Sequence, residues 1–331
     1  MVIVVSHARD SHTGVMMERM AQRGLHAELL DIADFPRGAS VTFRRRTGES
    51  STHSIHSPGR GCLCFEDADV VWWRRPQTFQ FPPGLNDPGH TVFARGELQE
   101  AFAGLWLSLD LFWINHPSRD QEASRKAFQL RVAADLGFEI PDTLITSNPQ
   151  DALRFVEQHG PQRIIYKSFS ATARHWRETR MLRPEEVLLL DNVRLAPVIF
   201  QEYIPAEVDL RITVVGDRIF PAAIYSQQTS YKYDFRMDML TAKVETALLP
   251  AEVEQKLLAY MRRLGLVYGA IDMRRTPDGR HVFLEINPAG QWLFVEERTG
   301  QPITDEMCSL MASHSRTSSV EAFTAAGGAS R

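Results

Sequence analysis

Two runs of β-branched and aromatic residues near the C-terminal end, separated by a strong turn signal, constrain the fold more than any other feature. Residues 267–273 read VYGAIDM, residues 281–287 read HVFLEIN, and the turn sequence TPDG occupies 276–279 between them. Such runs on either side of a turn are typical of neighbouring antiparallel strands. The sequence therefore predicts a β-hairpin in this part of the chain.

Three oxygen-bearing side chains lie on these two strands. If Pro277 and Asp278 are the central turn residues, Asp272 shares a sheet face with Glu285 and Asn287. A four-residue loop gives the same arrangement, whereas a three-residue loop would put Asp272 on the opposite face. Hard oxygen donors are what Mg²⁺ takes, usually together with nucleotide phosphates, so a nucleotide-dependent enzyme is indicated. The alternative is that Glu285 and Asn287 face solvent on an amphipathic strand, because LEIN alternates apolar and polar residues.

Composition indicates a soluble globular protein. A chain of 331 residues with 44% apolar and 24% charged residues is typical of a soluble protein with two or three lobes. The formal net charge of −4 gives no basic field for a nucleic-acid partner. No apolar run approaches the roughly 18 residues of a membrane span, and the N-terminus lacks the pattern of a signal peptide. Three cysteines without a CxxC pair argue against a disulfide framework and predict a cytoplasmic location.

The order of elements predicts an α/β protein. Its expected parts are an N-terminal α/β domain over 1–115, a second unit over 116–197, a strand-rich unit over 198–312 and a flexible tail over 313–331. Strands are expected at 2–6, 27–32, 40–46, 68–76, 163–169, 198–204, 210–216 and 218–226, and helices at 14–23, 96–113, 149–158, 184–193 and 250–265. Residues 47–60, 116–126 and 171–182 are expected to be loops.

Two lysines are candidates for binding phosphate. Lys167 ends an apolar strand, and a lysine directed into a lobe interior needs an anion to offset its burial. Lys126 lies near the start of a helix whose apolar face is expected to carry Phe128, Val132 and Leu136, and backbone N–H groups at a helix start also favour anions. The alternative for each is an ordinary solvated surface lysine.

The segment Gln201-Glu202-Tyr203-Ile204 closes another strand. Its backbone groups could bind an adenine edge while its apolar side chains sandwich the ring. Asp209 is then placed to bind a ribose hydroxyl, with a simple turn aspartate as the alternative.

Three arginines, Arg211, Arg236 and Arg274, lie on or beside the strand-rich unit and could clamp a phosphate or a substrate carboxylate. Surface charge is the alternative for each. The chain contains neither GxGxxG nor GxxxxGK[ST], so dinucleotide-binding and Walker-type sites are not supported.

Taken in order, these segments resemble the ATP-grasp ligase superfamily over roughly residues 110–305. The resemblance implies an ATP-grasp fold, in which an N-terminal pre-ATP-grasp α/β domain precedes central and C-terminal lobes that clasp ATP. By this resemblance the phosphate ligands are Lys126 and Lys167, the adenine-binding residues are Gln201, Glu202, Tyr203 and Ile204, the ribose ligand is Asp209, and the Mg²⁺ ligands are Asp272, Glu285 and Asn287. The loop after Lys167 lacks the glycines that many family members place over the phosphates. Either side chains such as Ser170, Thr172 or Arg174 would supply those contacts, or the loop would become ordered only with substrate.

Three further segments, WWRRPQTF, SQQTSYKYDFR and NPAGQWLFVEERTGQPI, look like the ATP-grasp maturases of graspetides, the microviridin-type peptide macrocyclases. That resemblance implies activation of a peptide side-chain carboxylate as an acyl phosphate and formation of an ω-ester or ω-amide ring in a precursor peptide. It also suggests a homodimer. The alternatives are a ligase that joins an amino acid to a small peptide or protein terminus, as in ribosomal-protein glutamate ligases and glutathione synthetase, and an ATP-binding protein without catalysis.

Overall fold

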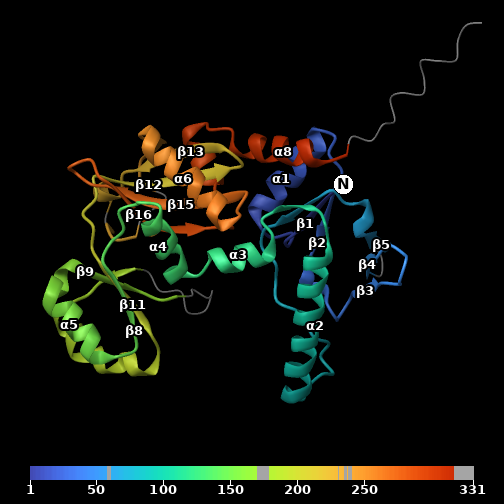
Figure 1. Ribbon diagram of the computed structural model, residues 1–331, viewed down its shortest axis with the longest axis horizontal. Helices are drawn as coiled ribbons and strands as arrows, with labels where there is room; N and C mark the ends of the chain where they lie inside the picture. The colour runs from blue at the N-terminus through green and yellow to red at the C-terminus, as the bar shows by residue number, and fades with distance from the viewer. Residues whose placement is uncertain (58–60, 170–178, 230, 235–236, 238–240, 317–331) are drawn as a thin grey trace, which may run out of the picture. The chain divides into compact units, whose positions relative to one another are not determined.

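The computed structural model describes residues 1–57, 61–169, 179–229, 231–234, 237 and 241–316, and it divides into two compact units (Figure 1). The first unit comprises Met1–Ile114 together with the chain from Thr304 onward. The second comprises Asn115–Ile303. Mixed helix and sheet in both units confirms the predicted α/β class.

The first unit is built on a four-stranded parallel sheet in the order β2-β1-β6-β7. Its strands are β1 (Val2–Val5), β2 (Ala27–Leu30), β6 (Val70–Trp73) and β7 (Phe112–Ile114), and its helices are α1 (Ser11–Gln22), α2 (Pro88–Ser108) and α8 (Ile303–His314). All four residues of β1 are buried, as an all-apolar strand flanked by two parallel neighbours must be. The predicted strands at 2–6, 27–32 and 68–76 are confirmed.

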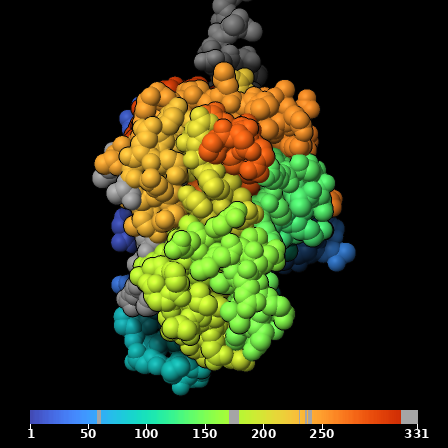
Figure 2. All heavy atoms as spheres, turned by 90° about the vertical axis from the view of Figure 1, so that its left-hand side faces the viewer, coloured from blue at the N-terminus to red at the C-terminus, as the bar shows by residue number. Residues whose placement is uncertain are grey.

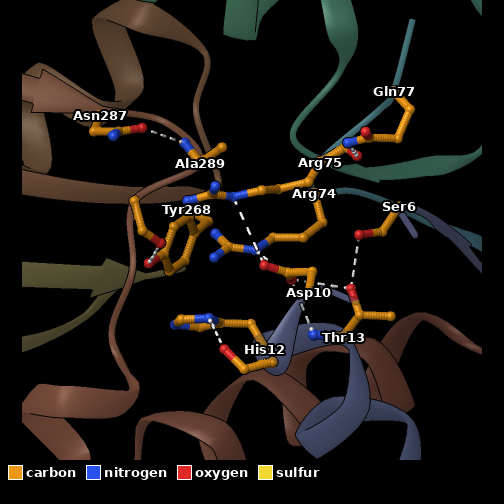
Figure 3. A network of polar contacts seen from close by, with 12 residues as sticks. Ser6, Asp10, His12, Thr13, Arg74, Arg75, Gln77, Tyr268, Asn287 and Ala289 are labelled. Atoms are coloured by element: carbon orange, nitrogen blue, oxygen red, sulfur yellow. Dashed lines mark hydrogen bonds and ion pairs between the residues drawn. The ribbon is translucent and has the colours of Figure 1, made fainter. Parts of the chain in front are cut away.

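The turn from β1 into α1 is tied to the end of β6 by a buried aspartate (Figure 3). Asp10 caps α1, since its carboxylate accepts hydrogen bonds from the Thr13 N–H at 3.0 Å and from the Arg74 Nε at 3.3 Å. Thr13 also donates its hydroxyl to Ser6 at 2.7 Å. Burial alone would raise the pKa of Asp10, but the Arg74 charge and the Thr13 hydrogen bonds outweigh it and lower that pKa.

Two predictions for the first unit are wrong. Residues 47–60 were expected to be a loop, yet Thr52–Ser57 forms β4, the centre of a three-stranded antiparallel sheet with β3 (Ser40–Arg44) and β5 (Gly61–Cys64). The strand is hard to recognise because histidine and serine occupy most of it, with His53 and Ile55 on the buried face. The helix expected at 96–113 runs from Pro88 to Ser108, because Asp87 caps it earlier and the residues after Ser108 lead into β7.

The second unit contains two antiparallel sheets. One is four-stranded, in the order β10-β9-β11-β8, and the other is five-stranded, in the order β14-β13-β12-β15-β16. The strands are β8 (Thr143–Thr146), β9 (Ile164–Lys167), β10 (Arg180–Met181), β11 (Val198–Glu202), β12 (Val208–Val215), β13 (Arg218–Ile224), β14 (Val244–Thr246), β15 (Tyr268–Arg275) and β16 (His281–Asn287). The predicted strands at 163–169, 198–204, 210–216 and 218–226 are confirmed, and β12 and β13 form a tight antiparallel hairpin.

The α-helices in the described part of this unit are α3 (Pro117–Ala123), α4 (Lys126–Asp135), α5 (Pro149–His159), α6 (Ala251–Leu264) and α7 (Leu293–Thr299). The end of α6 is the one predicted, with Gly265 in the left-handed conformation at φ 65°. Residues 116–126 were expected to be a loop, but Pro117 starts α3 after the cap residue His116. The helix predicted at 184–193 is present as a 3₁₀ helix over Pro184–Leu195. Met181 lies in β10, within a predicted loop.

Each sheet of the second unit has its own core. Leu257, Tyr260 and Met261 of α6 pack with Phe283 and Ile286 of β16 in one cluster, and Phe155 of α5 packs with Ile164 and Phe200 in the other. In Figure 2 the lobe around the four-stranded sheet is light green to yellow and lies below the orange part of the lobe around the five-stranded sheet. In the described part of the chain, no helix is long and apolar enough to cross a membrane.

Candidate active site

A cavity of about 360 Å³ lies in the second unit and is lined by residues of both sheets and of α4. Most of the residues predicted from the sequence line it: Lys126, Lys167, Gln201, Glu202, Ile204, Asp209, Asp272, Arg274, Glu285 and Asn287. They come from segments up to about half the chain apart in sequence, and the fold brings them to one place. Ser124, Tyr233 and Asp234 also line the cavity and were not singled out from the sequence.

The hairpin formed by β15 and β16 places Asp272 directly opposite Glu285. The turn is not the one assumed from the sequence. Thr276 bonds to Arg280 across a three-residue loop, with Gly279 at φ 86°, and that loop alone would put Asp272 on the wrong face. A β-bulge between Asp272 and Met273 shifts the register by one residue and restores the shared face. The predicted juxtaposition is therefore present, but for a different reason.

Both carboxylates are paired with cations. The Arg211 Nη1 lies 2.9 Å from the Asp272 Oδ1, and the Lys126 Nζ lies 2.7 Å from the Glu285 Oε2. Arg211 reaches Asp272 from the adjacent strand β12, where the two residues are directly paired. These two ion pairs lie in a partly buried environment, where each cation offsets the charge of its carboxylate.

Asn287 lies on the same face as Glu285, two residues further along β16. Its side-chain oxygen accepts a hydrogen bond from the Ala289 N–H at 3.0 Å (Figure 3). Two carboxylates and one amide oxygen that line a common cavity are a donor set that suits Mg²⁺. No cluster of three or more His, Cys, Asp or Glu suited to a metal occurs among the described residues, so any metal site here needs the amide of Asn287 or outside ligands.

Lys167 lies at the end of β9 and donates a hydrogen bond to the Gln201 Oε1 at 3.1 Å. Gln201, 1% exposed, in turn donates to the Thr143 Oγ1 at 2.8 Å. This chain of bonds crosses three strands and fixes the direction of the lysine. Lys167 therefore lines the cavity, consistent with a lysine directed into the lobe interior, and hydrogen-bonds a glutamine there.

The segment after β11 is held by a buried ion pair. Arg274 donates through Nε to the Asp209 Oδ1 at 2.8 Å and through Nη1 to the Ile204 carbonyl at 2.6 Å. Asp209 also accepts a short hydrogen bond from Ser226. Both charged side chains are about 5% exposed, so each needs the other. In this structure Arg274 thus holds the segment that was predicted to bind adenine.

The backbone N–H groups of that segment differ in whether they are free to bind a ligand. The Tyr203 N–H is bonded to the Arg163 carbonyl at 2.8 Å, whereas the Ile204 N–H has no acceptor among the residues that the structure describes. The Tyr203 ring lies over the Arg274 guanidinium, 5.2 Å from ring centre to Cζ, and burial raises the pKa of its phenol. A free N–H beside an aromatic ring is what an adenine edge requires.

Two supporting residues could not be recognised in the sequence. The Asn115 side chain bonds the N–H of Val267 and both backbone groups of Tyr268, which anchors the start of β15. Gln129 is 1% exposed and bonds the backbone of Ile286. An asparagine beside a strand and a glutamine within an amphipathic helix carry no distinctive local signal. Their importance appears only when distant strands lie against them.

Some predicted residues lie outside the described part of the chain. These are Arg236 and the residues Ser170, Thr172 and Arg174, which were expected to cover the phosphates.

Comparison with known proteins identifies the family. The sequence matches the MvdD pre-ATP grasp domain over residues 1–121 and the RimK-like ATP-grasp domain over residues 123–311. A search of curated proteins found no match.

Among solved structures, the chain is similar to macrocyclase MdnC bound with precursor peptide MdnA, from Microcystis aeruginosa MRC. The two share 30% identity and a TM-score of 0.83, over 94% of this chain and 99% of that one. It is also similar to a Chryseobacterium gregarium RiPP-associated ATP-grasp ligase in complex with ADP and a leader and core peptide, at 26% identity, a TM-score of 0.86, and coverage of 95% and 97%.

A third structure, ATP-grasp ligase PsnB complexed with a phosphomimetic variant of minimal precursor, Mg and ADP, supports the fold alone. It shares 21% identity and a TM-score of 0.76, with coverage of 95% of this chain and 98% of that chain. The matched domains follow each other along the chain, and the second alone spans more than half of it. The chain therefore belongs to the RimK-like ATP-grasp family, and it is an ATP-dependent ligase with a pre-ATP-grasp domain at its N-terminus.

Proposed function

We propose that this ligase forms a crosslink within a ribosomal precursor peptide. ATP transfers its γ-phosphoryl group to a side-chain carboxylate of the peptide, which gives an acyl phosphate and ADP. A hydroxyl or amine of the same peptide then attacks the acyl carbon, and phosphate leaves with its bonding electrons. The product is an ω-ester or ω-amide, with the peptide lighter by one water.

The observation that carries this proposal is the meeting of Lys126, Lys167 and the opposed pair Asp272 and Glu285 in one cavity. Phosphoryl transfer depends on positioning and on neutralising charge, and this arrangement offers both. The peptide substrate is supported by two relatives at 30% and 26% identity, which are a macrocyclase bound with a precursor peptide and a RiPP-associated ligase in complex with leader and core peptides.

We assign the adenine to the segment Gln201–Ile204, whose last residue has the unbonded N–H, and the ribose to Asp209. In the ligand-free structure the Asp209 carboxylate is bonded to Arg274 and Ser226, so a ribose hydroxyl would share it with them. The clamping roles of Arg211, Arg236 and Arg274 on substrate stay predictions. In the ligand-free structure Arg211 bonds Asp272 and Arg274 bonds Asp209.

The proposed Mg²⁺ ligands are Asp272, Glu285 and Asn287. Bound there, the cation would neutralise negative charge on the phosphates during transfer. Lys126 would then exchange its bond to Glu285 for a phosphate oxygen. The homodimer, the absence of a nucleic-acid partner and the cytoplasmic location also stay predictions.

A second candidate function is the ligation of a free amino acid to a peptide or protein terminus. It is favoured by the match of residues 123–311 to a domain named after RimK. The two functions need the same activation chemistry and differ in the acceptor.

One experiment separates them. The purified protein is incubated with ATP, Mg²⁺ and either a short peptide encoded beside it, rich in Thr/Ser and Asp/Glu, or a panel of free amino acids. ADP release is measured together with peptide mass, with Asp272→Asn as the inactive control. Loss of one water from the peptide supports the crosslinking function. ADP release with free amino acids alone would support the second candidate, and nucleotide binding without ADP release under any condition would refute both.

A further inference from the structure

Gln129 is a buried polar residue in α4 that none of the proposed chemistry uses. It lies three residues after Lys126, on the same side of the helix, and is 1% exposed. Its Nε2 donates to the Ile286 carbonyl at 2.9 Å and to the Ala123 carbonyl at 2.6 Å, and its Oε1 accepts from the Ile286 N–H at 3.2 Å. The amide is thus saturated with backbone partners, as a buried amide must be.

The two bonds to Ile286 complete the edge of a sheet. β16 is the last strand of the five-stranded sheet, so every second residue points its N–H and C=O away from β15. At Ile286 the carboxamide of Gln129 bonds both groups, as a neighbouring strand would. Further along the same edge, the Phe283 N–H donates to the Glu139 carbonyl at 2.8 Å. α4 therefore packs against β16 through a backbone-like contact (Figure 1).

The contact with Gln129 acts on the backbone next to the proposed metal ligands. Ile286 lies between Glu285 and Asn287, the two proposed metal ligands on β16. One peptide bond joins it to each of them. A rotation of the backbone at Ile286 would move both side chains at once. Because Lys126 is on the same helix as Gln129 and bonds Glu285 at 2.7 Å, α4 is bonded to the end of β16 at both Glu285 and Ile286.

We propose that Gln129 is a positioning residue for the metal site: its carboxamide fixes the backbone between Glu285 and Asn287 so that both side chains present their oxygens to one cation. The proposal rests on the metal site of the proposed function. Groups that orient metal ligands without touching the metal typically contribute about 10- to 100-fold in metal affinity. A residue that only stabilises the fold would leave that affinity unchanged.

The test uses Gln129→Leu in the full-length protein. Leucine keeps a similar volume but removes all three hydrogen bonds. Mn²⁺ serves as the probe, and its dissociation constant is measured by the electron paramagnetic resonance of free Mn²⁺ in the presence of a saturating non-hydrolysable ATP analogue. The matched control is Tyr260→Phe, which removes a hydroxyl that donates to the Gln129 carbonyl at 3.2 Å and leaves the carboxamide and β16 untouched. Thermal unfolding is measured for every variant.

We expect Gln129→Leu to raise the Mn²⁺ dissociation constant by about tenfold or more, and Tyr260→Phe to leave it within twofold of wild type while lowering the unfolding temperature. If Gln129→Leu does not fold, Gln129→Asn, which keeps the amide but shortens its reach, should show the same change. A folded Gln129 variant with wild-type Mn²⁺ affinity would overturn the positioning role alone. Wild-type protein that binds the nucleotide without Mn²⁺ would overturn the metal site and this proposal with it.

Discussion

The ion pair between Lys126 and Glu285 predicts that lysine and metal compete for the same carboxylate. The Lys126 Nζ lies 2.7 Å from the Glu285 Oε2, and both side chains are 22% exposed. Before nucleotide binds, Glu285 is therefore already neutralised by an ammonium group. Replacing Lys126 with Gln should strengthen the binding of a divalent cation to the nucleotide-free protein and weaken the binding of nucleotide.

The size of the effect follows from the geometry. At 2.7 Å and an effective dielectric constant of about 20, the attraction is roughly 6 kcal/mol, which is an upper limit. Desolvation and partial exposure reduce the net value to that of a charge-assisted hydrogen bond, about 1.5–3 kcal/mol. This corresponds to roughly 10- to 100-fold in a dissociation constant.

The assay measures Mn²⁺ binding without nucleotide and the binding of a non-hydrolysable ATP analogue with Mg²⁺, both by calorimetry. Lys256→Gln is the matched control, since the Lys256 Nζ forms an ion pair of the same 2.7 Å with Glu252 on α6 and does not line the cavity. We expect Lys126→Gln to bind Mn²⁺ about tenfold tighter or more, and the nucleotide correspondingly more weakly. Unchanged or weaker Mn²⁺ binding in Lys126→Gln would refute the competition.

Two further predictions concern stability. Gly290→Ala should lower the free energy of unfolding by about 1–3 kcal/mol in urea denaturation, because the added Cβ would clash with the Ala270 Cβ and lie 2.7 Å from the Arg211 Nη2. Gly104→Ala, in an open helical position, should instead stabilise by about 0.5–1 kcal/mol, and equal effects would contradict this account. Burial raises the pKa of Asp120 to about 6, and its Oδ2 has no hydrogen-bond partner in the described chain. Since this pKa exceeds the unfolded value, the free energy of unfolding falls as the pH rises from about 4 to 6. Asp120→Asn should therefore stabilise by up to about 3 kcal/mol at pH 7.5 and little at pH 3.5, and a pH-independent gain would refute the cause.

Much of the fold is predictable because local patterns report it directly. The all-apolar run of β1, the capped amphipathic helix α6 and the hairpin between β12 and β13 each have a signal within a few residues. The errors fall where that signal is weak. β4 consists mostly of histidine and serine, which are not typical strand residues. α3 is a short polar helix whose start depends on the pair His116 and Pro117.

The candidate site, too, was predictable in part from local sequence and in part only from the tertiary structure. Its ligand types and their order along the chain are properties of the sequence, which alone indicated a nucleotide site with two lysines and three oxygen ligands. Whether Asp272 faces Glu285 depends on the bulge between Asp272 and Met273, which is a property of the pairing of β15 with β16 and which no turn signal predicts.

The sequence by itself thus indicated the family, most of the strands and helices, and which residues are candidates for the chemistry, since these depend on residue type and short-range spacing. Only the tertiary structure decided how those residues are supported. Arg211 on Asp272, Lys126 on Glu285, and Gln129 on the backbone of Ile286 join residues 61, 159 and 157 positions apart. Contacts over such separations depend on how whole elements pack, because burial forces each polar group to find a partner wherever the fold provides one.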